Sequence, residues 1–145
     1  MQDGLERPLL PETITADFAI PGATMSEPEF LHRLTGATGC GLRLDVTNVE
    51  VNAANHGFDA RAFLAALPLD RVVQVHLAGG AREGGRLIDT HGAPVSEVSW
   101  ELLAALAARA PVRAVLLERD LDFSDPEGLI AEVARARVTV ARAAA

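Results

Sequence analysis

Four short apolar runs in this sequence each end in a residue that binds metal ions in proteins. The four terminal residues are Glu12, Asp45, His76 and Glu118. Carboxylate and imidazole groups together suit iron, manganese or zinc, and a bridging carboxylate suits a pair of irons. Parallel strands present their carboxyl ends on one face, where α/β folds build their sites. The pattern therefore predicts a metal centre assembled from distant parts of the chain.

A second feature is the pair Asp89 and His91, which are separated by one residue. In an extended segment this spacing places both side chains on the same side. Such a pair can chelate one ion or contact two neighbouring ions. Structural interpretations stand beside these: Asp45 as a cap of the segment that follows, His76 as a buried core histidine, and Glu118 as the ion-pair partner of a neighbouring arginine.

The elements that must position these residues follow from periodicity and from capping and turn signals. Strands are predicted over residues 7–11, 41–46, 72–77 and 112–117, helices over residues 26–35, 59–67, 98–110 and 125–137, a loop over 52–57, and a helix tail or irregular start over 1–6. Gly36 and Gly39 are expected to end the first of these helices. The strand-then-helix order predicts an α/β fold with four parallel βα units, either half of an eight-stranded barrel or one small open sheet.

Length and composition restrict the class of protein. The 145 residues, 49% of them hydrophobic, predict a single domain over residues 1–145. The net charge of −7 argues against nucleic acid or an acidic membrane surface as a partner. No apolar run is long enough to cross a bilayer, and no signal peptide is evident at Met1. A single cysteine excludes an internal disulfide and favours a cytoplasmic protein.

Several motifs resemble those of one known family. In chain order they are Asp45-Val46-x-Asn48, Asn55-His56-Gly57, His76-Leu77-Ala78-Gly79, Ile88-Asp89-Thr90-His91 and Leu117-Glu118-Arg119-Asp120. With them, nearly the whole chain resembles the DUF692 family, also called multinuclear non-heme iron-dependent oxidases. The resemblance implies a TIM barrel related to the xylose isomerase-like barrels. Because family members are about twice as long, it also implies that this chain corresponds to the C-terminal half of a (β/α)8 barrel.

The resemblance implies a chemistry as well. Characterised members bind two or three irons, activate O2 and oxidise a residue of a ribosomally made peptide, often a cysteine. The residues that would bind metal here are Glu12, Asp45, His76, Asp89, His91 and Glu118. Asn48 would support these ligands or bind weakly, whereas Asn55 and His56 would hold their loop or contact substrate.

Partners form the last expectation. The resemblance implies a peptide substrate and a peptide-recognition partner protein. A four-strand half barrel leaves two open edges and one uncovered face, so a second copy or a separate chain would supply the missing half. The alternative is a catalytically incomplete scaffold or partner subunit that retains the half-barrel fold. A metal-dependent isomerase or an endonuclease-like enzyme would rest on fold analogy alone.

Overall fold

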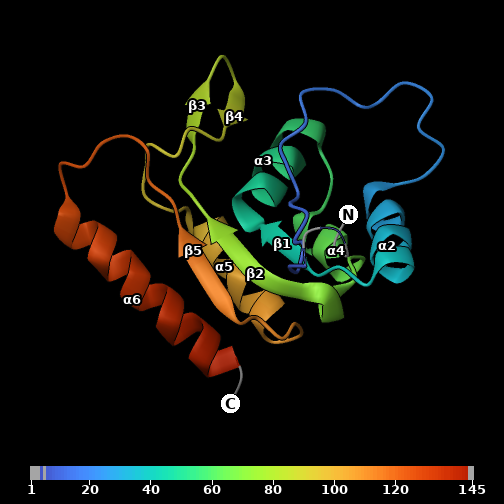
Figure 1. Ribbon diagram of the computed structural model, residues 1–145. Helices are drawn as coiled ribbons and strands as arrows, with labels where there is room; N and C mark the ends of the chain where they lie inside the picture. The colour runs from blue at the N-terminus through green and yellow to red at the C-terminus, as the bar shows by residue number, and fades with distance from the viewer. Residues whose placement is uncertain (1–3, 5, 144–145) are drawn as a thin grey trace.

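A computed structural model describes residue 4 and residues 6–143, so most of the predicted N-terminal segment 1–6 lies outside the described residues (Figure 1). The described elements are α2 (Glu27–Thr38), β1 (Leu42–Asp45), α3 (Val46–His56), α4 (Ala60–Ala65), η1 (Leu69–Arg71), β2 (Val72–Leu77), β3 (Ala81–Glu83), β4 (Arg86–Ile88), α5 (Glu97–Ala107), β5 (Ala114–Leu117) and α6 (Pro126–Ala143). The predicted α/β character is confirmed.

The main sheet contains three parallel strands in the order β1-β2-β5. In this register Asp45 lies beside His76, and His76 lies beside Leu116. The prediction of a strand at residues 7–11 is wrong, because these residues form no strand and Glu12, which follows them, makes only an isolated parallel bridge with Arg43. Prolines at positions 8 and 11 have no N–H to donate, which explains why no regular ladder forms there. The sheet therefore has three strands and one bridged segment.

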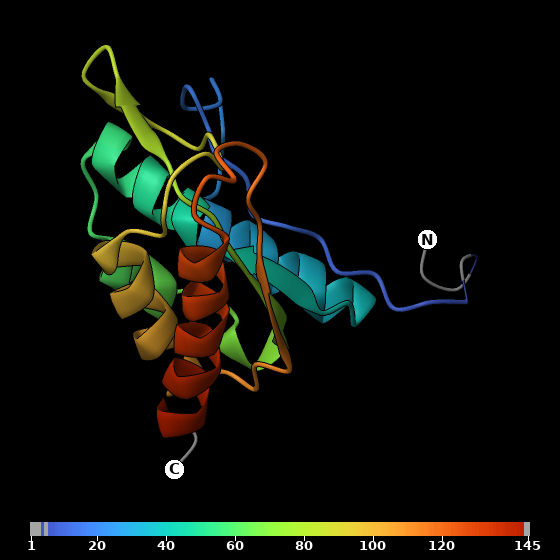
Figure 2. The ribbon, with the colours of Figure 1, turned by 90° about the vertical axis from the view of Figure 1, so that its left-hand side faces the viewer.

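Helices pack against one face of the sheet. Figure 1 shows α5 behind β2 and β5, and Figure 2 shows α6 beside α5. Leu44, Val75 and Leu77 on the strands are fully buried with Leu103 and Leu106 of α5. The opposite face carries polar side chains near the carboxyl ends of the strands and is partly open, with Leu116 41% exposed. This asymmetry leaves the Asp45 and His76 row free to form a site.

Helix α3 begins directly after β1. It extends to His56, so the prediction of a loop over residues 52–57 is wrong. Asp45 caps this helix, because its Oδ1 accepts a hydrogen bond from the backbone N–H of Asn48 at 2.9 Å. The helix ends at Gly57, whose φ of 74° is left-handed. The prediction that Gly36 ends the preceding helix is also wrong, since α2 continues to Thr38 and ends at Gly39 with φ 68°.

A two-stranded antiparallel hairpin, β3–β4, projects beyond the carboxyl end of β2 (Figure 1). Asn55 of α3 anchors it: Nδ2 donates to the carbonyl of Leu87 at 2.7 Å, and Oδ1 accepts from the N–H of Leu87 at 2.9 Å. Among the described residues, no helix has both the length and the hydrophobicity that crossing a membrane requires.

Candidate metal centre

Three of the predicted ligands meet at the carboxyl ends of the strands. The Nδ1 atom of His76 lies 3.0 Å from Oε1 of Glu12 and 3.0 Å from Oδ2 of Asp45. One ligand atom from each residue lies within 4.8 Å of the other two. Asp45 and His76 are only 1% and 3% exposed. We call Glu12, Asp45 and His76 the first cluster.

The surrounding backbone fixes this first cluster. Thr13, next to Glu12, accepts a hydrogen bond from the N–H of Asp45 at its Oγ1, at 3.1 Å. Asn48 Nδ2 donates to the carbonyl of Thr13 at 3.1 Å. Arg43 forms an ion pair with the second oxygen of Glu12. Each carboxylate is therefore held by more than its contact with the histidine.

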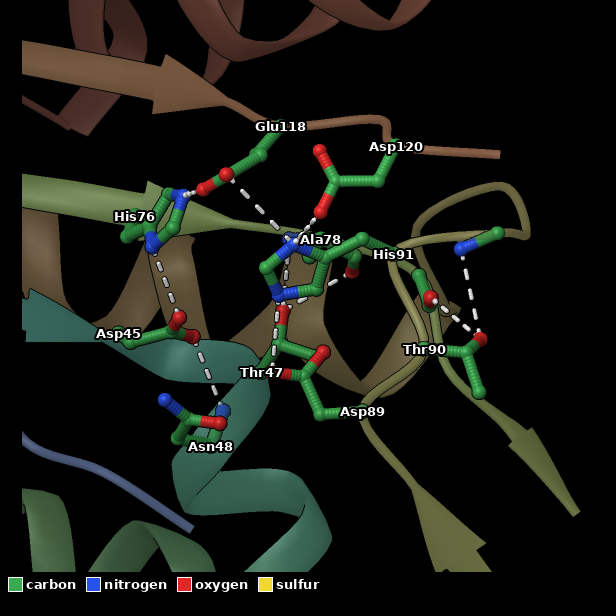
Figure 3. Close-up of polar contacts among 12 residues, drawn as sticks. Asp45, Thr47, Asn48, His76, Ala78, Asp89, Thr90, His91, Glu118 and Asp120 are labelled. Carbon is green, nitrogen blue, oxygen red and sulfur yellow. Dashed lines mark hydrogen bonds and ion pairs between the residues drawn. The ribbon is translucent and has the colours of Figure 1, made fainter. Parts of the chain in front are cut away.

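A second cluster lies beside the first and comprises His91, Glu118 and Asp120 (Figure 3). His91 Nδ1 lies 3.1 Å from Asp120 Oδ2 and 3.8 Å from Glu118 Oε1. His91 Nε2 lies 2.9 Å from Asp89 Oδ2, so Asp89 adjoins this cluster on the opposite side of the ring.

Glu118 connects the two clusters. Its Oε2 contacts Nε2 of His76, while its Oε1 faces His91 (Figure 3). The two imidazole rings are 5.8 Å apart and nearly perpendicular, at 84°. A carboxylate positioned between two histidines could contact two neighbouring cations.

The electrostatics show an excess of negative charge around the histidines. The hydrogen bond to Asp45, aided by Glu12 and Glu118, raises the pKa of His76 to about 9 despite its burial. Burial opposes protonation of His91, but Asp89 and the other carboxylates outweigh it and raise its pKa. Burial raises the pKa of Asp89. In the absence of another cation, a proton on His76 offsets part of the carboxylate charge.

All six residues predicted as ligands lie in or beside these two clusters, and whether they bind metal stays a prediction. Asp120 was not predicted, although the spacing Glu118-x-Asp120 repeats that of Asp89-x-His91 and could have indicated it. Asn48 lies next to the first cluster. Asn55 anchors the hairpin, and Nε2 of His56 lies 2.6 Å from the carbonyl oxygen of Ala16, so these two hold loops.

The donor set fits a metal ion. Two oxygens in this region, Oδ1 of Asn48 and Oδ1 of Asp89, are buried without a hydrogen-bond partner among residue 4 and residues 6–143. Buried polar atoms normally have a partner, and an unsatisfied one is a sign of a missing ion or water. Carboxylates with imidazoles favour iron, manganese or zinc over calcium or magnesium.

Fold and site together define an α/β protein with a carboxylate–histidine candidate metal centre at the carboxyl ends of parallel strands. The chain belongs to the family described as RiPP precursor modification enzyme MbnB/TglH/ChrH, which matches residues 1–141 and corresponds to DUF692. The resemblance seen in the sequence motifs is thereby confirmed.

Similar proteins include UPF0276 proteins from three bacteria. The chain is 48% identical over 147 residues to one from Bordetella pertussis, covering 97% of this chain and 50% of that protein. It is 46% identical over 143 residues to one from Caulobacter vibrioides, covering 97% of this chain and 51% of the relative. It is also 46% identical over 138 residues to one from Pseudomonas aeruginosa, covering 94% of this chain and 48% of that protein. The chain spans about half the length of the curated relatives it matches.

Proposed function

We propose that this chain is the C-terminal half of a (β/α)8 barrel, with residues 1–145 as one unit, in an iron-dependent oxidase that modifies a ribosomally made peptide in the cytoplasm. The observation that carries the proposal is the position of Glu118 between His76 and His91, which come from different parts of the chain. The family's description as precursor modification enzymes supports a peptide substrate.

The sheet supports the barrel assignment. The bridged Glu12 segment, β1, β2 and β5 follow one another in chain order and are all parallel. Successive neighbours in one direction are the arrangement of consecutive barrel strands. The outer strand β5 and the Glu12 segment would each pair with strands of a missing half, supplied by a second copy, a separate chain or a longer form of this protein.

Each cluster would hold one cation, with Glu118 shared between them. The first position would use Glu12, Asp45 and His76, and the second would use His91 and Asp120 with support from Asp89. The chemistry that iron supplies when bound is the activation of O2 and the acidification of a substrate thiol. The chain contributes orientation: Arg43 holds Glu12, while Asn48 and Thr13 fix the loop around Asp45.

Anaerobic reconstitution tests the metal assignment. The purified protein is loaded with ferrous iron, desalted and analysed for iron per chain, in its monomeric and assembled forms. We expect stoichiometric iron that is lost in a His76→Ala, His91→Ala double variant. His32→Ala is the matched control, because His32 lies on α2 and contacts the carbonyl of Ala66 instead. Near-zero iron in all forms of the wild type would contradict the proposal.

The second candidate function is a catalytically incomplete scaffold or subunit that binds a partner such as a peptide-recognition protein. A groove of ≈ 440 Å³ between β5 and α6 favours it, because apart from Arg113 and Arg137 the groove is lined by apolar residues such as Val115, Leu117 and Val140. Oxygen consumption with a peptide substrate separates the two candidates. An iron-loaded assembly that consumes O2 only in the presence of the peptide favours the oxidase.

A further inference from the structure

A carboxylate on helix α6 joins the two loops that carry the second cluster. Glu132 Oε1 accepts a hydrogen bond from the backbone N–H of Val95 at 2.6 Å. Glu132 Oε2 accepts one from Nη2 of Arg119 at 3.0 Å. Val95 follows His91 by four residues, and Arg119 lies between Glu118 and Asp120. One side chain therefore contacts both loops from outside the cluster.

This connection is largely shielded from solvent. The side chains of Arg119 and Glu132 are 10% and 14% exposed, whereas those of a surface pair such as Arg61 and Glu101 are 61% and 63% exposed. Exposed pairs contribute little because water screens them, but removing one partner of a buried pair leaves an uncompensated charge. The Arg119–Glu132 pair is therefore a fixed part of this region.

The two loops also contact each other through their backbones. The carbonyl of His91 accepts hydrogen bonds from the N–H of Asp120 at 2.9 Å and of Leu121 at 3.4 Å. His91 itself has a φ of 51°, a left-handed conformation that is unfavourable for a non-glycine residue. Such a conformation persists only where surrounding contacts hold it. The relative position of His91 and Asp120 thus depends on how firmly the two loops are joined.

We propose that Glu132 is a positioning residue for the second cluster: it holds the His91 loop and the Glu118–Asp120 loop at the separation that binds a cation. The inference rests on the proposed metal function. Groups that orient metal ligands without touching the metal typically change its affinity about 10–100-fold. The first cluster is anchored separately, through Thr13 and Asn48. Glu118 contacts both clusters, but the other two members of the second cluster, His91 and Asp120, also lie on the loops that Glu132 joins. Loss of Glu132 should therefore weaken the second cluster more than the first.

The test compares Glu132→Ala and Glu132→Gln with the matched control Glu97→Gln. Glu97 pairs with Arg135 and links α5 to α6, and among the described residues its side chain forms no hydrogen bond with either ligand loop. Co²⁺ is titrated into each metal-free protein and followed by its visible absorption. We expect two Co²⁺ in the wild type and in Glu97→Gln. Glu132→Ala should lower the Co²⁺ affinity of one site by at least about tenfold and leave the affinity of the other within about twofold of the wild type. Glu132→Gln should recover part of the loss, because its amide oxygen still accepts from Val95.

Hydrogen exchange of the metal-free proteins gives a readout that does not depend on metal. The amides of Asp120 and Leu121 should exchange faster in Glu132→Ala than in the wild type or Glu97→Gln. The positioning role alone would be overturned if both Co²⁺ affinities were unchanged in Glu132→Ala. It would also be overturned if both affinities fell equally together with the Tm. A wild type that binds no Co²⁺ or iron would overturn the proposed function and with it the role of Glu132 in metal binding.

Discussion

The two oxygens of Asp45 serve different purposes. Oδ1 caps helix α3 through Asn48, and Oδ2 contacts His76. A sequence can predict either role, because aspartate after a strand suits both a cap and a ligand. Only the structure shows that the same side chain performs the first and is placed for the second.

Substitutions at Asp45 should separate these purposes. Asparagine caps helices about as well as aspartate, so Asp45→Asn should keep the cap but lose the carboxylate that faces His76 and the proposed cation of the first cluster. Asp45→Ala should lose the cation and about 1 kcal/mol more of stability, because the cap is removed. Denaturant unfolding and metal analysis of both variants measure the two effects. Equal stability of the two variants would contradict the cap.

The pKa of His76 predicts how the stability of the metal-free protein depends on pH. Because the folded-state pKa of about 9 exceeds the ordinary 6.5, the protonated ring stabilises the fold fully below pH 6.5, and this stabilisation is lost as the pH rises through about 9. His91, whose pKa is also raised, contributes with the same sign. The Tm measured in the presence of a chelator should therefore fall as the pH rises from 6.5 to about 9, and it should fall less steeply in His76→Gln. A Tm that rises with pH over this range would contradict the stabilising charge on His76.

The six candidate ligands were predictable because each follows or lies near a short apolar run, and strand ends converge in parallel sheets. Asp120 was missed because its place beside His91 depends on the path of the loop after β5, which turns back so that its N–H meets the His91 carbonyl. The ion pair of Glu12 with Arg43 was missed for a similar reason, since it depends on the register of the bridged segment.

At the scale of elements, strand β2 was predicted at its observed bounds because its valines and leucine, interrupted only by Gln74 and His76, are flanked by turn signals. Helix α3 was not, since asparagine has a low helix propensity and Asn48, Asn52 and Asn55 recur along it. These side chains instead reach outward to neighbouring loops: Asn52 bonds the backbone of Ile14 and Ala16 at 2.9 and 2.8 Å, for example. Tertiary contacts outweigh the local preference.

Two glycine substitutions should have opposite effects on the elements. Gly36 lies inside α2 with open space around an added Cβ, so Gly36→Ala should stabilise the protein by about 0.5–1 kcal/mol. An added Cβ at Gly79 would lie 1.8 Å from the carbonyl oxygen of Ala93, so Gly79→Ala should displace the loop that carries His91 and cost about 1–3 kcal/mol or more. Thermal unfolding of both variants checks the signs. A stabilised Gly79→Ala would show that this loop packs differently.

At the scale of the whole molecule, β5 is an edge strand of the described sheet, and the groove between it and α6 is lined mostly by apolar residues. Edge strands present unpaired backbone groups that invite a further strand. The family relatives are about twice as long, and a barrel has no edges. The open edge of β5 and the span of about half the relatives' length both support the proposal that this chain is half of a barrel.

Completion of the barrel should be measurable at β5. When the missing strands are supplied, the outward backbone N–H groups of Ala114–Leu117 should become protected from hydrogen exchange, because they gain strand partners. Exchange of the isolated chain is compared with that of the assembled protein at equal concentration. The amides of β2, which already has two neighbours, serve as the internal control. Unchanged exchange at β5 would argue against a strand at this edge.

The cap formed by Asp45 has a consequence for judging relatives of this protein. Selection for folding alone would retain aspartate or asparagine at this position, even in a relative that lacks the proposed metal centre, because the residue caps the first turn of α3. The presence of this residue in a relative is therefore weak evidence that the relative is an active enzyme. His91 caps none of the described helices and has an unfavourable backbone angle, so its presence or absence in a relative is better evidence for or against the proposed metal centre.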